Sequence, residues 1–168
     1  SKMRSIVAKK PFSLAYGGAG AAYGGKGGNG FGHTLAGKAY GDEILTNLYG
    51  GSGGGVAVDQ PFQLGVLKGP RGRGGSGGGA IKIVAVNDIV IGSHAVISCE
   101  GEQGADGYSA GGGGGSGGSI LLVAGGSIQI DGRLSVAGGD GGRRKSAAPM
   151  NRDDSFGGHG GAGSGGRI

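Results

Sequence analysis

The side chains that most often catalyse reactions or bind metals are few in this chain, and they are scattered. The three histidines, His33, His94 and His159, lie far apart, and each has glycine, serine or another small residue beside it. Acid–base catalysis needs clustered titratable groups, and metal sites need ligands at short, recurring spacings. The sequence therefore predicts solvent-facing or structural histidines, no catalytic residues, no metal, no cofactor and no enzymatic activity.

Two glycine-rich stretches partly match the patterns of calcium-binding and phosphate-binding loops. Calcium-binding β-rolls use a nine-residue glycine–aspartate repeat, but the glycines around Asp140 form only a fragment of it and do not recur in register. The run from Gly24 to Gly30 is similar in composition to a phosphate-binding loop. No strand leads into that run and no helix follows it, so the helix N-terminus that holds phosphate is missing.

Composition restricts the fold and the partners. Glycine supplies 49 of 168 residues, several times the usual share of roughly 7%. The net charge is +5 and charged residues make up only 16%, so no nucleic-acid surface is predicted. No apolar stretch approaches the ~20 residues of a membrane span. The lone Cys99 ends an apolar run and is predicted to be a buried free thiol.

Short apolar runs interrupt the glycine-rich stretches, and two groups of these runs form a repeat. Gly-Ser-Gly-Gly begins at residues 51, 75, 115 and 163 and precedes an apolar run or the chain end. With a shift of 39 (120 − 81), Ile81 aligns with Ile120 and Ile89 with Ile128; the same shift aligns Ala95 with Leu134 and Ile97 with Val136. Apolar residues alternate within each run, which is typical of strands with one buried face. The predicted core comprises Ile81, Ile83, Ile89, Ile91, Ile120, Leu122, Ile128, Ile130, Leu134 and Val136.

Glycine has a period of its own. It recurs at every third residue over 69–78, 101–107, 111–117 and 157–166. A period of three matches polyproline-II geometry, in which the backbone makes no internal hydrogen bonds. Bare Cα positions let another backbone approach closely, so these segments are expected to bond to neighbouring segments.

These patterns predict an all-β, elongated glycine-rich repeat fold, a parallel β-helix or solenoid with polyglycine-II-like segments. Residues 1–50 form an irregular segment rich in glycine and tyrosine, and residues 51–168 the repeat region, with units at about 75–111 and 115–160. Short strands are expected near 6–8, 12–15 and 56–58. Residues 42–48 suit either a helical turn or a strand.

The run from Gly115 to Leu122, followed by Gly126–Gly132 and Leu134–Gly139, resembles repeats in glycine-rich surface proteins. It is similar to haemagglutinin-like secreted bacterial adhesins and to glycine-rich extracellular proteins of plants and protists. That resemblance covers about residues 51–168 and implies a right-handed parallel β-helix. A bundle of polyglycine-II helices joined by strands, as in some phage tail-fibre tips, stays open as a second architecture.

The expected function follows from shape. Open strand ends recruit further strands, so we expect a structural subunit of an extracellular filament or surface layer that assembles with itself, head to tail. Ile6, Arg167 and Ile168 are the candidate assembly residues. The alternative is an adhesin that binds glycan, an extracellular polysaccharide or a receptor. Its candidate contacts are Tyr16, Tyr23, Tyr108, Arg143 and Arg144, because tyrosine rings and basic groups recur at binding surfaces.

Overall fold

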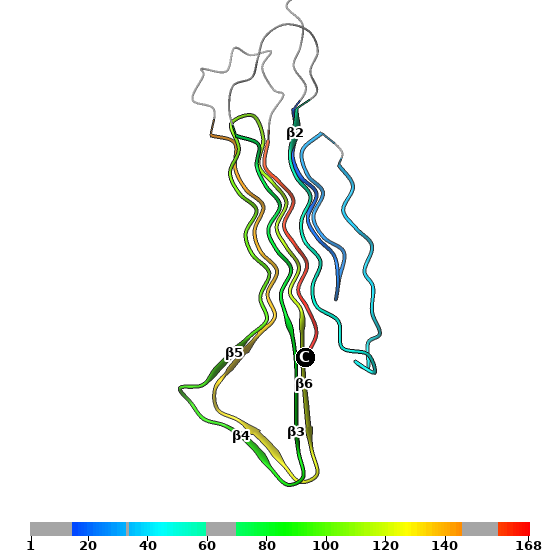
Figure 1. Cartoon of the computed structure of the whole chain (residues 1–168), viewed down its shortest axis with the longest axis vertical. Coiled ribbons are helices and arrows are strands. Elements are labelled where there is room, and N and C mark those ends of the chain that lie inside the picture. The colour runs from blue at the N-terminus through cyan, green and yellow to red at the C-terminus, as the bar shows by residue number, and fades with distance from the viewer. Residues whose placement is uncertain (1–14, 33, 60–69, 146–157) are drawn as a thin grey trace, which may run out of the picture.

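The computed structural model describes residues 15–32, 34–59, 70–145 and 158–168. Within them the molecule has two parts. One is a bundle of extended, glycine-rich segments that run side by side along the long axis, and the other is a strand-bearing end below that bundle in Figure 1. Residues far apart in sequence lie next to each other in both parts, so the fold depends on long-range backbone contacts.

Six short strands build the strand-bearing end. The first unit contributes β3 (Ala80–Ala85), β4 (Ile89–Ile91) and β5 (Val96–Ser98). The second contributes β6 (Ser119–Ala124), β7 (Ile128–Ile130) and β8 (Arg133–Ser135). Each strand of the first unit pairs in parallel with its counterpart in the second, which gives three two-stranded sheets. Figure 1 shows these sheets as the sides of a triangle.

The register of two sheets confirms the predicted repeat. Ile81 pairs with Ile120, and Ile89 pairs with Ile128, both at the expected offset of 39 residues. In the third sheet Ile97 pairs with Leu134, an offset of 37 (134 − 97), so the predicted alignment there is wrong by two residues. The turn before β8 is shorter than the turn before β5. A shift of two residues keeps each side chain on the same face of its strand.

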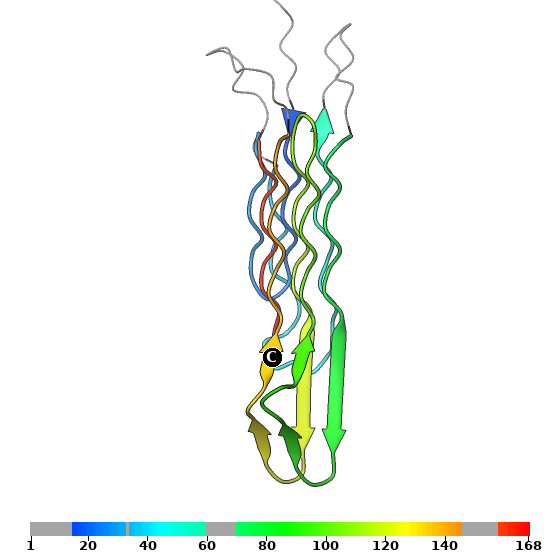
Figure 2. The same ribbon diagram turned by 90° about the vertical axis from the view of Figure 1, so that its left-hand side faces the viewer.

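The glycine bundle has a central segment, residues 109–118, in which every residue is buried. Six further segments surround it and hydrogen-bond to it through the backbone. We call them the ring segments: residues 15–24, 49–59, 70–79, 99–108, 136–145 and 158–167. Around the ring, each segment also bonds to the next, through the pairs 19–55, 54–75, 76–102, 104–140, 139–163 and 161–18. Six neighbours around one extended chain is a hexagonal packing. Figure 2 shows the segments from the side, as wavy ribbons that run along one another.

Bonds between two segments recur at every third residue. Gly75 and Gly78 donate to the carbonyls of Gly113 and Ser116, and Gly111, Gly114 and Gly117 donate to segment 158–167. A helix with three residues per turn presents its N–H groups in three directions, so one chain can bond to several neighbours at once. The polar backbone is thereby satisfied without a β-sheet.

Burial follows the same period. In segment 158–167, Gly158, Gly161 and Ser164 are buried, whereas His159 and Ala162 are exposed. The buried positions must be small because backbone atoms of neighbouring segments occupy the space of a side chain. A Cβ on Gly161 would lie 2.0 Å from the carbonyl oxygen of Gly28.

The predicted elongated β-helix or solenoid is wrong. Each parallel sheet has two strands, and the remaining sheet, β1 (Ala15–Tyr16) with β2 (Val58–Asp59), is antiparallel. The strand-forming residues of the repeat occur in only two aligned units, and the glycine segments carry few large apolar side chains that a stacked coil could bury. Those segments pack backbone to backbone instead, so among the described residues only two strand units stack and no elongated solenoid forms.

Residues 42–48 form turns, neither a helix nor a strand, with Leu45 at φ 52°. The strand expected near 6–8, with Ile6, lies outside the described residues. Of the one expected over 12–15, Ala15 is in β1. The N-terminal part of the described chain is integral to the bundle, because Gly18 and Ala21 donate to the central residues Gly111 and Gly114.

Candidate functional site: the strand-bearing end

The outer edges of the three parallel sheets are the most distinctive surface of the strand-bearing end. In a parallel pair each strand uses only part of its backbone groups toward its partner, and the others point to the opposite edge. Among the described residues, β4, β5, β7 and β8 each pair with one strand only. These edges therefore present free N–H and C=O groups to solvent.

Apolar side chains line the same end. The exposed fraction is 90% for Val86, 66% for Val90 and 64% for Val96. These valines extend outward from the triangle because the alternate residues, such as Ile89 and Ile91, point inward and are buried. An edge that combines free backbone groups with β-branched apolar residues is suited to pairing with another strand.

Paired apolar side chains of the two strand units differ in their exposure to solvent. Ile89 and Ile91 on β4 are 8% and 6% exposed, whereas their partners Ile128 and Ile130 on β7 are 44% and 46% exposed. Among the other predicted core residues, Ile120 is buried and Ile81 is 37% exposed. Ile83, Leu122, Leu134 and Val136 are half-buried. β7 of the second unit therefore offers a less covered apolar surface than β4, whereas in the first sheet Ile120 of β6 is better covered than Ile81 of β3.

A carboxylate joins the two units at the turn between strands. Asp88 accepts hydrogen bonds from the backbone N–H of Ser127 at 2.6 Å and from its hydroxyl at 2.8 Å. The backbone hydrogen bond and then the hydroxyl bond lower the pKa of Asp88 below its ordinary value of 3.8. At the other end of the triangle, Glu100 forms an ion pair with Arg133 and accepts a hydrogen bond from Ser135.

A tyrosine cluster closes the junction between the bundle and the strands. The rings of Tyr23 and Tyr40 lie 5.0 Å apart, and those of Tyr40 and Tyr49 lie 6.4 Å apart. The guanidinium of Arg167 lies 5.7 Å from the centre of the Tyr23 ring and donates to the carbonyl of Tyr40. Tyr23 is fully buried, so its ring is not a surface contact for a partner.

The other predicted assembly and contact residues are dispersed. Arg167 forms a parallel bridge to Ser119 beside β6, and Ile168 is 61% exposed. Tyr108 is exposed, Tyr16 is half-buried, and His33 lies outside the described residues. Arg143 is exposed and Arg144 is half-buried, both on segment 136–145. The structure does not bring the tyrosines and arginines expected to contact a partner into one site.

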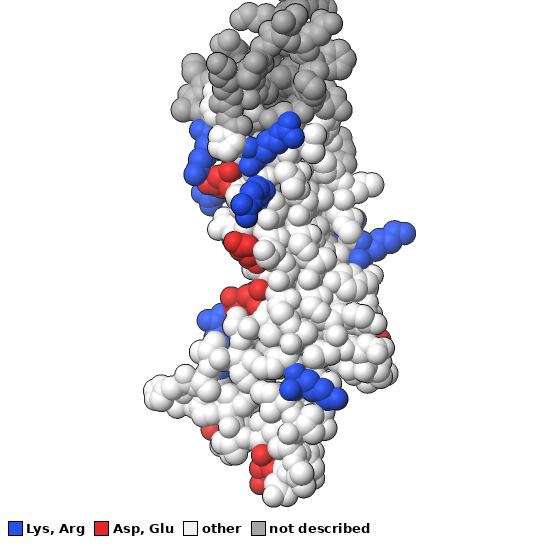
Figure 3. All heavy atoms as spheres, viewed as in Figure 1, with Lys and Arg blue, Asp and Glu red and all other residues white. Residues whose placement is uncertain are grey.

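Charged and metal-binding side chains form no reactive centre in the part of the chain that is described. No group of three or more metal-binding side chains occurs there. Basic and acidic side chains are interspersed along one side of the bundle in Figure 3, and Lys145 pairs with Asp106 at 3.5 Å. Cys99 is buried and free, as predicted, and burial raises the pKa of its thiol.

Comparison with known proteins identified no relative of this chain. No protein-family model, no curated protein and no solved structure matches this chain. The resemblance to haemagglutinin-like adhesins therefore stays a prediction. Within the described ranges, no helix has the length and apolar character needed to cross a bilayer.

Sequence reasoning missed the site's main feature, which is the valine-rich outer edge. Val84, Val86, Val90 and Val96 were visible as the second register of each alternating run. Apolar β-branched residues at both registers of a strand, isoleucine at one and valine at the other, are the signal that could have indicated an edge with two apolar faces.

Proposed function

We propose that this protein is a structural subunit of an extracellular filament or surface layer, and that copies associate through the open strand edges. The observation that carries the proposal is the coincidence of free backbone edges on β4 and β7 with exposed Val90, Ile128 and Ile130. Natural proteins usually protect such edges with charge, proline or a covering segment. On β4 none of the three is present among the described residues.

The bundle suits a load-bearing role in that subunit. The central segment is bonded on six sides, so the chain is fixed by many weak, distributed backbone bonds. Each bond contributes about 1 kcal/mol, and their cooperation makes the bundle stiff. Stiffness together with self-complementary edges is what a filament or layer requires.

The test is self-association of the purified chain. We expect sedimentation and electron microscopy to show assemblies whose size grows with concentration. Val90→Lys introduces a charge on the β4 edge and should reduce association at least tenfold. Leu35→Lys is the matched control, because Leu35 is 77% exposed and lies outside the strand-bearing end. A wild-type chain that stays monomeric at high concentration would refute the proposal.

A second candidate, glycan binding by an adhesin, is favoured by one observation. An open hollow of about 500 Å³ is lined by Gln103, Asp140, Arg143 and His159 with small residues between them. Mixed donors and acceptors in such a hollow suit a sugar's hydroxyl groups. Binding to an array of polysaccharides, lost in Arg143→Ala, would support this candidate, and no binding to any of them would exclude it.

A further inference from the structure

Charge differs between the two ends of the molecule. Residues 80–98 and 119–135 form the strand-bearing end, and their basic and acidic side chains are equal in number: Lys82, Arg133, Asp88 and Asp131. At the end of the bundle that lies away from the strands, blue side chains gather around a red one in Figure 3. Two ring segments carry basic residues there, which we call the basic patch: Arg71, Arg73, Arg143, Arg144 and Lys145.

Backbone hydrogen bonds bring these basic residues together. Residues 105–108 form a strip between the two ring segments. On one side of the strip the N–H of Ala105 donates to the carbonyl of Arg73 at 2.8 Å, and on the other side the N–H of Gly107 donates to the carbonyl of Arg143 at 3.0 Å. Arginines from two segments therefore flank one strip of backbone.

Nearby carboxylates do not neutralise the basic patch. Residues 70–73, 105–108 and 143–145 contain five basic side chains and one acidic side chain, Asp106, which gives a net charge of +4 (5 − 1). Asp106 pairs with Lys145 at 3.5 Å. The next carboxylates along the bundle, Glu102 and Asp140, lie about one turn of three residues closer to the strands.

The arginines of the basic patch have unused hydrogen-bonding capacity. None of the four forms an ion pair with another described residue. Two guanidinium nitrogens of Arg144, Nε and Nη1, are buried without a hydrogen-bond partner among the described residues. A buried charged donor without an acceptor costs free energy, and an anionic oxygen is the acceptor that a guanidinium binds most strongly.

A hollow with mixed polar groups adjoins the basic patch. Its volume is about 500 Å³ and its lining includes Arg143, so this side chain belongs to both. Gln103, Asp140 and His159 supply donors and acceptors for the hydroxyl groups of a sugar. Single-stranded nucleic acid is typically held by several aromatic side chains, whereas the strip offers one exposed ring, that of Tyr108. Positive charge beside a polar hollow therefore favours a sugar ligand that carries anionic groups.

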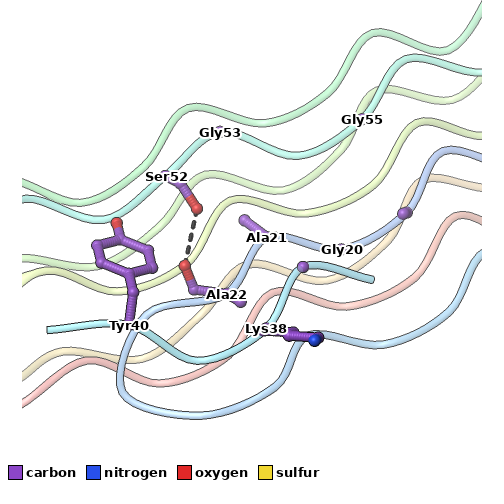
Figure 4. Close-up of a pocket in the computed structure, with 10 residues that line it drawn as sticks. Gly20, Ala21, Ala22, Lys38, Tyr40, Ser52, Gly53 and Gly55 are labelled. Atoms are coloured by element: carbon purple, nitrogen blue, oxygen red, sulfur yellow. Dashed lines mark hydrogen bonds between the residues drawn. The ribbon is translucent and has the colours of Figure 1, made fainter. Parts of the chain in front are cut away.

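Another hollow, across the ring from the basic patch, lacks this combination. It measures about 260 Å³ and lies beside ring segments 15–24 and 49–59. Figure 4 shows Lys38, the one charged side chain among the described residues that line it. The hydroxyl of Ser52 is already bonded to the carbonyl of Ala22 at 2.8 Å. An anionic ligand is therefore expected at the basic patch and not at this second hollow.

We infer that the basic patch and the hollow that adjoins it bind an acidic polysaccharide, a chain of sugars that carry carboxylate or sulfate groups. The arginines bind the anionic groups, because a guanidinium can donate two parallel hydrogen bonds to such a group. The hollow takes the hydroxyl groups of a neighbouring sugar. The inference rests on the second candidate function, glycan binding, and names its ligand class. Since the strand edges lie at the opposite end, one molecule can bind this ligand and associate with its copies.

The experiment measures binding of the purified full chain to two pairs of polymers by isothermal titration calorimetry. Each pair joins an acidic polymer to its neutral counterpart: polygalacturonate with its methyl ester, and dextran sulfate with dextran. We expect binding to at least one acidic polymer, weakened by added salt, and no binding to its neutral counterpart. The pair that responds shows whether carboxylate or sulfate is the group recognised.

Two double variants locate the site. Arg73→Gln combined with Arg143→Gln should weaken binding about tenfold or more, because each change removes a charge-assisted contact. The matched control combines Lys38→Gln with Lys82→Gln, which removes two positive charges from exposed lysines outside the basic patch. The control should change the affinity by less than about twofold, since salt screens distant charges.

Several results would overturn the inference. These are equal weakening by the two double variants, equal binding of an acidic polymer and its neutral counterpart, and tighter binding to a single-stranded oligonucleotide than to either acidic polymer. Binding to the neutral polymers alone would overturn the acidic ligand class and leave glycan binding standing, whereas no binding to any of the polymers would overturn both. None of these results bears on self-association, which Val90→Lys tests separately.

Discussion

The hydroxyl of Tyr23 lies 2.5 Å from Oγ of Ser119, and both side chains are completely buried. Ser119 donates its only hydroxyl proton to the carbonyl of Tyr49 at 2.6 Å, so Tyr23 must be the donor to Ser119. This chain of two hydrogen bonds joins a ring segment to the first residue of β6. It fixes the bundle to the strand-bearing end.

Removing the Tyr23 hydroxyl should loosen that junction. Tyr23→Phe leaves the ring contacts intact but removes one buried hydrogen bond, so we expect the free energy of unfolding to fall by about 1 kcal/mol. Chemical denaturation measures the loss. Tyr108→Phe, at an exposed ring, is the control, and an equal effect of the two changes would contradict the role of the Tyr23–Ser119 bond.

A methyl group in the central segment should be far more damaging. A Cβ on Gly114 would lie 2.0 Å from the carbonyl oxygen of Gly139, whereas a Cβ on Gly79 would meet nothing within 4 Å. We therefore expect Gly114→Ala to destabilise the fold by about 3 kcal/mol or more. Gly79→Ala should be neutral or slightly stabilising, through reduced freedom of the unfolded chain. Similar melting temperatures for the two variants would rule out close packing around residue 114.

The two adjacent alanines of segment 15–24 should respond differently to proline. The N–H of Ala21 donates to Gly114 at 2.9 Å, but that of Ala22 has no partner among the described residues. Proline suits an extended backbone and removes only the donor. Ala21→Pro should cost about 2 kcal/mol or more, and Ala22→Pro should leave thermal unfolding nearly unchanged. A reversed order would show that the hydrogen bonds donated by the N–H groups of segment 15–24 are assigned wrongly.

Acid should weaken the link between the two strand units. The folded state lowers the pKa of Asp88 from its ordinary value of 3.8, so the contribution of this carboxylate is complete above that value. It is lost as the pH falls through the lower pKa of the folded state. Asp88→Asn should therefore be less stable than wild type near neutral pH, and the difference should shrink below about pH 3.8. A difference that is independent of pH would argue against an ionised Asp88.

Several features of the fold were predictable because side chains determined them. The alternation around Ile81 and Ile89 identified both strand units and the register of two sheets, since one face of each strand needs burial. The third register was missed because a turn length, not a side-chain pattern, sets it. The elongated solenoid was wrong because only two strand units stack among the described residues.

The hexagonal bundle was not predictable from the same reasoning. The ring segments are all rich in glycine and compete for the same places, and glycine offers no side chain by which to choose among them. One signal was available: residues 109–119 contain nothing larger than serine. Only such a run tolerates neighbours on every side, which is why it occupies the centre.

The central segment also determines how this protein should respond to temperature. Much of the surface that this segment buries on folding is peptide backbone, not hydrocarbon. On unfolding, newly exposed polar surface lowers the heat-capacity change, whereas newly exposed apolar surface raises it. The change in heat capacity per residue should accordingly be small. A small change flattens the dependence of stability on temperature, so the molecule should resist cold and heat over an unusually broad range.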